Sequence, residues 1–205
     1  MPLTPSETSR ILDDLGHRPK KKLGQNFLVD GNIVRKSIAM ANLPEGIPVV
    51  EVGPGLGTLT RQLLANNHPV YAVEIDTVLA ESLEKEFSSF IKSNLFNLCR
   101  GDAVKLPVAN LPGNIKEFAV VANLPYAISS PWMESLLNQK RIPLRMVLML
   151  QKETVFRLQI MGGRITMHYR SFLNRALNRF RLIPCPGNAF FQFPGLIQFS
   201  CIWKG

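Results

Sequence analysis

The stretch that decides the fold runs from Val49 to Gly57 and reads VVEVGPGLG. Its first half is a short apolar run that predicts a buried strand, and its second half carries glycines that let the backbone approach a ligand. The GxGxG spacing differs from the GxGxxG dinucleotide fingerprint, and no Lys-Ser or Lys-Thr follows as in a phosphate-binding loop. We therefore expect a neutral or cationic adenosine ligand without a pyrophosphate, with an ordinary glycine turn as the alternative.

The alternation of strand and helix continues on the C-terminal side of this stretch. Leucines at helical spacing follow the glycines, and a single longer helical pattern spans Leu79 to Phe90. Strands that alternate with helices pair in parallel through right-handed crossovers, so we expect an α/β fold with a doubly wound sheet. Further strands are expected at Val70–Val73, Leu95–Cys99, Phe118–Ala122 and Met146–Leu150.

Two other helices and one irregular segment are expected around this pattern. Apolar residues between Ile33 and Ala41 fall on one helical face, ahead of the first strand. Ser129 or Ser130 can cap a later helix that carries Pro131 in its first turn. Residues 1–19 are polar and without periodicity, which predicts a flexible N-terminal arm.

Two acidic residues stand just after predicted strands, where the ligands of doubly wound sheets bind. Glu74 lies 21 residues beyond Gly53, a separation at which an acid can accept both hydroxyls of a ribose. Asp102 follows the third strand and is in position to accept the exocyclic amine of an adenine. The alternatives are a solvated glutamate and an aspartate that only closes a turn.

The most specific signal is Asn123-Leu124-Pro125-Tyr126, directly after the fourth strand. Pro125 lacks a backbone donor and fixes the chain, so that the Asn123 side chain and the neighbouring carbonyls can point at a ligand. Tyr126 offers a flat face on which a base can stack. Ordinary loop chemistry accounts for Asn-Leu-Pro, but not for these four residues in this order after a strand.

Composition limits the class of protein. The chain has 205 residues, of which 46% are hydrophobic, enough for one domain with a sizeable core. We see no secretory signal and no apolar run that could span a bilayer, and three cysteines without CxxC spacing indicate reduced thiols in a cytoplasmic protein. The net charge of +9 favours a polyanionic partner, yet residues 154–205 hold seven Lys and Arg and no Asp or Glu. The total charge is therefore weak evidence for RNA binding.

Six motifs follow one another along the chain: LGQNFL (23–28), EVGPGLG (51–57), VEID (73–76), GDA (101–103), NLPY (123–126) and LMLQKE (148–153). In this order and spacing they resemble the ribosomal RNA adenine N6,N6-dimethyltransferase family, of the small-subunit, kasugamycin-resistance type. The resemblance covers roughly Lys20 to Glu153. It implies a class I S-adenosylmethionine-dependent methyltransferase fold, which is Rossmann-like, followed by a small helical domain. The substrate would be two adjacent adenines in a hairpin loop near the 3′ end of small-subunit rRNA.

The resemblance also implies roles for individual residues. S-adenosylmethionine would be bound by Gly53, Gly55, Glu74, Asp102 and Asn123, with Asn26 and Leu28 closing over it. The catalytic residues would be Asn123, Leu124, Pro125 and Tyr126, and Phe191 would be a second aromatic residue that stacks on adenine. No metal is required, and the scattered histidines are expected to be structural or surface residues. We expect a monomer.

The chemistry agrees with these roles. An adenine amine is a poor nucleophile because its lone pair is delocalised into the ring. The Asn123 side-chain oxygen and the Leu124 carbonyl can accept its two N–H bonds and stabilise the positive charge that develops on nitrogen. Tyr126 would stack on the splayed base, since loop bases are the readable part of RNA.

Beyond Glu153 the resemblance degrades. The family's Phe-Phe-Pro-Pro-Pro-Lys-Val-like stretch is represented by Phe190-Phe191 running into Gln192-Phe193-Pro194-Gly195, and the chain ends at Gly205 with no room for the helical domain. A basic RNA-binding tail is one explanation, and out-of-frame or degenerate sequence is the one we favour. We accordingly expect residues beyond about 162, which in this family supply the last strands of the sheet, to pack poorly, and methylation to be weak or absent.

These observations divide the chain into a flexible arm (1–19), an S-adenosylmethionine-binding methyltransferase domain (20–160) and a divergent basic segment (161–205). Two other functions stay open. One is a non-catalytic RNA-binding factor in ribosome assembly. The other is the related large-subunit, erythromycin-resistance type of rRNA adenine methyltransferase, although the LGQNFL and NLPY forms favour the small-subunit type.

Overall fold

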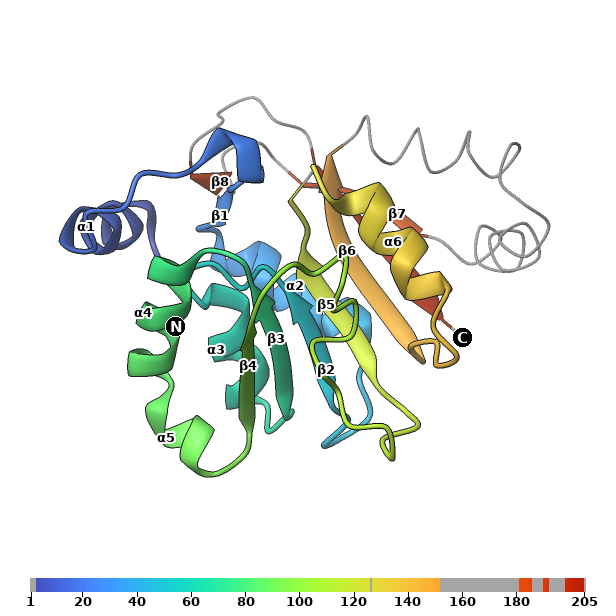
Figure 1. Ribbon diagram of the computed structural model, residues 1–205. Coiled ribbons are helices and arrows are strands. Elements are labelled where there is room, and N and C mark those ends of the chain that lie inside the picture. Colours follow the sequence, from blue (N-terminus) through green and yellow to red (C-terminus); the bar gives the residue numbers. More distant parts are fainter. Residues whose placement is uncertain (1–2, 126, 152–180, 186–189, 192–197, 205) are drawn as a thin grey trace.

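The structure is a computed structural model that describes residues 3–125, 127–151, 181–185, 190–191 and 198–204. A seven-stranded sheet with the order β4-β3-β2-β5-β6-β9-β7 forms its centre (Figure 1). Strands β2 to β6 pair in parallel, which confirms the doubly wound α/β fold expected from the sequence. The sheet strands are β2 (Val49–Val52), β3 (Val70–Glu74), β4 (Phe96–Arg100), β5 (Ala119–Asn123), β6 (Arg145–Gln151), β7 (Arg181–Cys185) and β9 (Gln198–Lys204).

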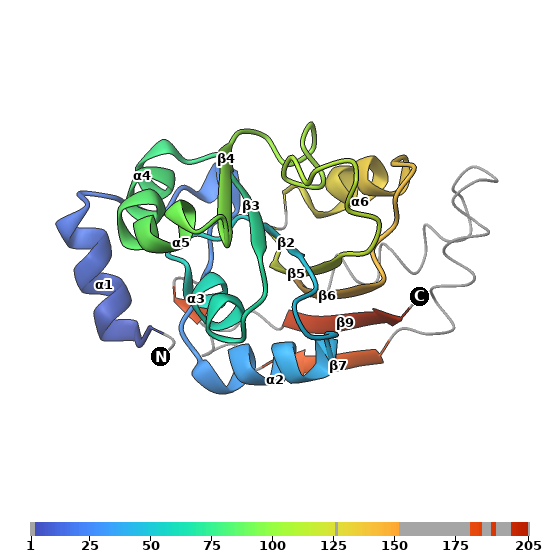
Figure 2. The same cartoon turned by 90° about the horizontal axis from the view of Figure 1, so that it is seen from below.

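Two hydrophobic layers cover the sheet, one on each face. Helices α2 (Gly31–Ala41), α3 (Thr58–Ala65) and α4 (Thr77–Glu86) pack on one face, and α6 (Ser129–Leu137) packs on the other with the segment from Ala103 to Leu111. Figure 2 shows α2 and α6 on opposite sides of the strands. All four residues of β2 are buried, as expected for a central strand of a parallel sheet that is covered on both faces.

One helix of each layer differs from its expected form. The pattern from Leu79 to Phe90 forms two helices, α4 and α5 (Ser88–Lys92), because Phe87 leaves helical geometry and turns its ring edge-on to Phe96. In α6 neither serine acts as the expected N-cap. The Ser129 hydroxyl instead donates to the Pro125 carbonyl, at 2.9 Å. Ile128 occupies the N-cap position, so no side chain caps the helix.

The N-terminal segment is not the irregular arm that the sequence predicted. It contains α1 (Pro5–Asp14), which begins with a capping box in which Thr4 and Glu7 bond each other's backbone N–H. Leu12 is buried in a small cluster with Phe27, Leu56 and Leu79. The sequence pattern Thr-x-x-Glu was the available signal for this helix. The apolar face of α1 is short, because only a few of its residues pack against the rest of the protein.

The C-terminal segment contributes two strands to the sheet. The backbone of β9 pairs antiparallel with β6 over seven residues, and β7 pairs with β9. The expected poor packing of this segment stays a prediction, because the burial of its side chains lies outside what the structure describes. A short second sheet joins β1 (Phe27–Leu28) to β8 (Phe190–Phe191). Antiparallel pairing needs only a backbone that is able to extend, so altered motif residues do not prevent it. The expected boundary at residues 160 and 161 lies outside the described residues.

A candidate ligand site at the carboxyl ends of the strands

A pocket opens where β2, β3, β4 and β5 end, at the position at which ligands bind to doubly wound sheets. Residues 22–28 form a further part of its wall. We call residues 17–26 the strip; it contains the short helix η1 (Lys21–Leu23). In Figure 1 η1 and β1 lie above the upper edge of the sheet. The expected site residues that line this pocket are Asn26, Leu28, Gly53, Gly55, Glu74, Asp102, Asn123, Leu124 and Pro125.

The glycine loop after β2 has a backbone that other residues rarely adopt. Gly55 has φ +61° and turns its N–H toward Glu74, whose Oε2 accepts it at 3.1 Å. Gly57 has φ +73°, and a Cβ built there would lie 2.6 Å from the ring of Phe87. The glycines therefore serve both the curvature of the loop and the close approach of α3 to α4.

Glu74 is buried at the end of β3, with only 4% of its surface exposed. Besides the Gly55 N–H, its carboxylate accepts the backbone N–H of Asp76 at 2.9 Å. Burial raises the pKa of Glu74 above its ordinary value, against the lowering effect of these two hydrogen bonds. Each carboxylate oxygen has two lone pairs, so the group can still accept ribose hydroxyls. That role stays a prediction.

Asp102 lines the pocket and also closes a turn. Its Oδ1 accepts the backbone N–H of Val104 at 2.9 Å, and its carbonyl accepts those of Lys105 and Leu106. Asp102 can therefore both close the turn and contact a ligand, because the turn uses only one of its two carboxylate oxygens. Its contact with an adenine stays a prediction.

Asn123 ends β5 and meets the strip. Its Nδ2 donates to the Asn26 carbonyl at 2.8 Å, while its Oδ1 is buried without a hydrogen-bond partner among the described residues. Asn26 Oδ1 is buried and unpartnered in the same sense. A buried polar atom left unpaired costs about 1–3 kcal/mol, so two such acceptors in one pocket indicate a ligand that brings donors.

The other expected residues differ in how much the structure says of them. Leu28 and Leu124 are buried and line the pocket beside Pro125. Tyr126 lies outside the described residues. The backbone of Phe191 pairs with that of Phe27 in β1, next to the strip, but its side chain is not described. Stacking by these two aromatic residues stays a prediction.

Two acidic residues of the site were not singled out from the sequence. Glu51 is 2% exposed, lines the pocket and accepts the Thr60 hydroxyl at 2.6 Å; burial raises its pKa to about 8. Its only signal was an acid inside the apolar run VVEV. Asp76 is 2% exposed and accepts hydrogen bonds from the strip. Its partners are distant in sequence, so no local pattern marks it.

The histidines that the structure describes have structural contacts, as expected. His17 Nε2 lies 2.9 Å from Asp76, His68 Nδ1 lies 3.2 Å from the Ile47 carbonyl, and His168 falls outside the described residues. Among the described residues, no three His, Cys, Asp or Glu side chains gather in a way that could hold a metal ion. No helix in the same residues is long and apolar enough to cross a membrane.

Comparison with protein families and curated proteins gives consistent matches. Residues 16–174 match the sequence model of the family described as ribosomal RNA adenine dimethylase. Ribosomal RNA small subunit methyltransferase A of Opitutus terrae is 50% identical over 164 residues, which are 80% of this chain and 58% of that protein. The protein of the same name from Lysinibacillus sphaericus is 39% identical over 163 residues, 78% of this chain and 55% of that protein. The chain thus spans little more than half the length of these relatives.

Solved structures show the same fold. A dimethyladenosine transferase from Plasmodium falciparum superposes with a TM-score of 0.65 at 25% identity, covering 87% of this chain and 62% of that one. The 23S rRNA methyltransferase ErmE superposes with a TM-score of 0.65 at 23% identity, covering 87% and 69%. The similarity to ErmE, at 23% identity, is evidence for the fold alone.

Proposed function

This chain belongs to the ribosomal RNA adenine dimethylase family, and from that membership we propose that it dimethylates N6 of two adjacent adenines in small-subunit rRNA, using S-adenosylmethionine. The family and its structural neighbours are S-adenosylmethionine-dependent methyltransferases. The observation that carries the proposal is the unpartnered, buried Asn123 Oδ1 in the pocket at the strand ends. A hydrogen-bond acceptor in that position is what an adenine amine requires.

The acidic residues of the pocket suit a cationic cofactor. Glu51 and Glu74 are buried acids that line it; burial favours their protonated forms, and a bound cation would favour their ionised forms instead. Gly53 and Gly55 line the pocket without a side chain between backbone and ligand, and Asp102 is available to the adenine. Bound there, S-adenosylmethionine would supply an already activated methyl group, so the protein has only to position the amine.

The remaining chemistry belongs to the residues after β5. Asn123 Oδ1 and the Leu124 carbonyl accept the two amine hydrogens, which favours a tetrahedral nitrogen and stabilises its developing positive charge. Pro125 keeps this turn fixed. Tyr126 and Phe191 are proposed to stack on the adenine. No side chain is needed as a strong base, because the nitrogen becomes acidic as it is methylated.

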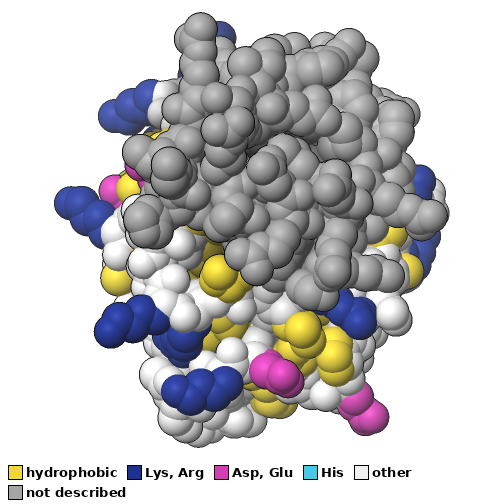
Figure 3. All heavy atoms as spheres, turned by 90° about the vertical axis from the view of Figure 1, so that its right-hand side faces the viewer, with side chains coloured by type: hydrophobic (Ala, Val, Ile, Leu, Met, Phe, Trp, Pro, Cys, Tyr) yellow, Lys and Arg dark blue, Asp and Glu magenta, His cyan; other side chains and the backbone are white. Residues whose placement is uncertain are grey.

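The substrate side of the proposal rests on the relatives and on charge. Both curated relatives are named for the small ribosomal subunit. Figure 3 shows dark-blue Lys and Arg side chains projecting at several places around the rim of one face. Phosphates of RNA are the natural partner of such a surface. We propose a monomer that acts on the pre-ribosomal small subunit in the cytoplasm without a metal, with residues 20–160 as the methyltransferase domain.

The alternative of a non-catalytic RNA-binding factor is favoured by one observation. The resemblance of the chain to the family pattern fades beyond Glu153. Measurements of cofactor binding and of methyl transfer distinguish the two functions.

Calorimetry with S-adenosylhomocysteine tests the pocket, and transfer of labelled methyl groups to unmethylated small-subunit particles tests the reaction. Large-subunit RNA serves as the substrate control.

We expect binding together with transfer to adenines of the small subunit, and transfer slower by on the order of a hundredfold in the Asn123→Ala variant. Binding without transfer would support the non-catalytic factor instead. Transfer to large-subunit RNA alone would assign the chain to the erythromycin-resistance type. Absence of both binding and transfer would contradict the proposed function.

A further inference from the structure

The strip has little backbone support of its own. In the part of the chain that the structure describes, the strip makes three backbone–backbone hydrogen bonds outside strand ladders: His17 N–H to the Leu12 carbonyl, Leu23 N–H to the Lys20 carbonyl and Gly24 N–H to the Lys21 carbonyl. The first joins the strip to α1, the other two are internal, and none of them reaches the seven-stranded sheet. The position of the strip over the pocket therefore depends on side chains and on the burial of β1 beyond it.

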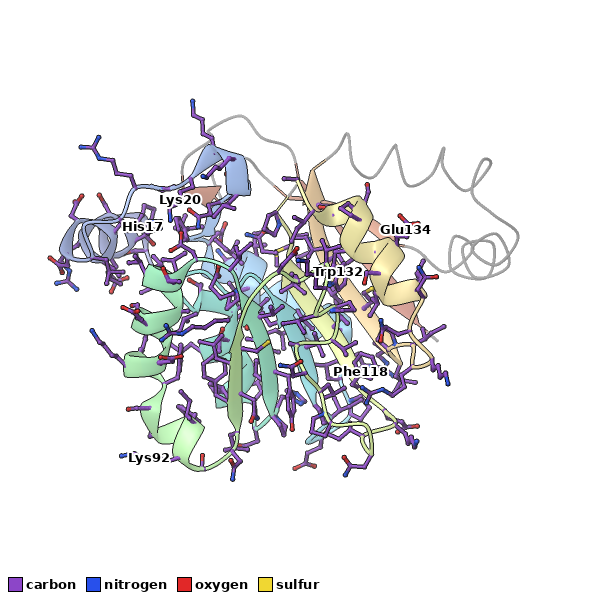
Figure 4. All side chains as sticks on the ribbon, in the orientation of Figure 1. His17, Lys20, Lys92, Phe118, Trp132 and Glu134 are labelled. Atoms are coloured by element: carbon purple, nitrogen blue, oxygen red, sulfur yellow. The ribbon has the colours of Figure 1, made fainter. Side chains whose placement is uncertain are left out.

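Three side chains of the strip converge on one atom. Asp76 Oδ2 accepts from His17 Nε2 at 2.9 Å, from Lys20 Nζ at 2.8 Å and from Gln25 Nε2 at 3.1 Å. Gln25 also accepts the backbone N–H of Lys20 at 2.8 Å, which closes the turn of the strip. Figure 4 shows His17 and Lys20 together, between α1 and the upper end of α4.

This carboxylate differs from a surface ion pair. The side chains of Asp76 and His17 are 0% and 2% exposed, while that of Lys20 is 43% exposed and so contributes less. Burial acts to raise the pKa of Asp76, but the hydrogen bonds from His17, Lys20 and Gln25 outweigh it and hold the pKa well below its ordinary value. Asp76 is therefore an anion at working pH. Removing its partners leaves a buried charge uncompensated.

Asp76 also contacts the ligand site. Its backbone N–H donates to Glu74 Oε1 at 2.9 Å, and its Oδ1 caps α4 by accepting the Val78 N–H at 3.1 Å. At the other end of the strip, the Asn26 carbonyl accepts from Asn123. The strip is thus held at two points on either side of the pocket, one next to Glu74 and one at Asn123.

We propose that Asp76 is a positioning residue that holds the strip over the cofactor pocket through His17, Lys20 and Gln25, and that cofactor affinity depends on this contact. The inference rests on the proposed function only in naming S-adenosylmethionine as the ligand. Asp76 acts through the strip and touches no reacting atom. The Asp76 N–H donates to Glu74, so Asp76 links the strip to the proposed ligand contact. Ligand binding at Glu74 and attachment of the strip to Asp76 should therefore each favour the other.

The test uses the full chain and the Asp76→Asn variant. Asparagine keeps an oxygen for the α4 cap but places an amide donor where the strip needs an acceptor. Hydrogen exchange of the amides in residues 20–26 should become about tenfold faster or more, the equivalent of one lost charged hydrogen bond, while β2 amides keep their rates. The Kd for S-adenosylhomocysteine should rise by a similar factor.

Further variants separate positioning from folding. The double variant His17→Ala with Gln25→Ala leaves the α4 cap intact and should have the same two effects. The single variant His17→Ala should also speed up hydrogen exchange in the strip. His17→Gln keeps a hydrogen-bond donor and should restore most of the protection from exchange that His17→Ala loses. Glu84→Gln breaks an exposed pair with Arg100 and is the matched control, with neither effect expected.

Two results would overturn the inference. The first is that the amides of the strip exchange at the wild-type rate in the double variant; this result is sufficient even if Asp76→Asn does not fold. The second is that these amides exchange faster while the Kd for S-adenosylhomocysteine stays unchanged. Neither measurement needs RNA, so failure of the strip to respond is distinguishable from failure of the chain to methylate.

Discussion

The side-chain amide of Asn123 donates to the backbone carbonyl of Asn26 at 2.8 Å, a contact between residues 97 positions apart. The contact fixes which way the amide points, because the opposite orientation would set two oxygens against each other. Its nitrogen is occupied by the strip, and its oxygen is left without a partner among the described residues. The strip therefore orients the acceptor that the proposed reaction uses.

Replacing Asn123 by alanine should reduce methylation far more than cofactor binding. The variant loses an acceptor whose hydrogen bond strengthens as the nitrogen becomes charged, which is worth on the order of a hundredfold in rate. Single-turnover methylation and calorimetry with S-adenosylhomocysteine give the two numbers. Asn97→Ala is the control, since the Asn97 side chain donates to the Asn94 carbonyl in its local turn, away from the pocket. An equal loss in rate and affinity would make Asn123 a cofactor or folding residue.

Replacing Glu74 by alanine should weaken cofactor binding by roughly 10–150-fold, the cost of a lost charged acceptor. The structure adds a second reason, since Glu74 also holds the Gly55 and Asp76 N–H groups. Calorimetry on Glu74→Gln, which keeps one acceptor oxygen, should give an intermediate Kd. Wild-type affinity in both variants would remove Glu74 from the site.

Glu51 should make the cofactor-free protein less stable as pH rises. Its pKa is raised from an ordinary 4.5 to about 8, so the folded protein binds the proton more tightly than the unfolded chain. The stabilisation is complete below the unfolded pKa and is lost as pH rises toward the folded pKa, by up to about 1.4 kcal/mol per unit. Urea unfolding across this window should show a smaller decline for Glu51→Gln. Parallel declines in both proteins would contradict an un-ionised Glu51.

Replacing Gly57 by alanine should destabilise the fold by about 1–3 kcal/mol, because a Cβ would lie 2.6 Å from the Phe87 ring on a backbone of positive φ. Gly46→Ala separates the two causes, since Gly46 also has a positive φ but no atom within 4 Å of the added Cβ. Its cost should be backbone strain alone. Thermal unfolding of both variants measures the difference, and equal costs would show that α3 and α4 yield without strain.

The place of β9 in the sheet can be tested by Ile202→Pro. Ile202 lies opposite Val147 in β6 and Arg181 in β7, so proline there removes a donor from the middle of a three-stranded ladder. We expect a loss of about 1–3 kcal/mol in unfolding free energy. Ile202→Thr keeps the donor and should cost less. Wild-type stability of the proline variant would support the expectation that this segment packs poorly.

The sequence by itself predicted the features that depend on local pattern. Apolar runs between helical segments were enough for the five parallel strands, and the order of motifs was enough for the pocket at their carboxyl ends, where Glu74, Asp102 and Asn123 all lie. Each of these residues follows a strand directly. Because parallel strands end at one edge, position in the chain and position in space coincide there.

Tertiary structure alone decided what depends on contacts between distant segments. The docking of α1, the convergence of the strip on Asp76 and the raised pKa of Glu51 have weak or no signals in neighbouring residues. His17 and Asp76 are 59 positions apart, and nothing in either neighbourhood specifies the other. A polar residue's pairing and ionisation follow from which groups surround it and how much water is excluded, and only the folded chain sets both.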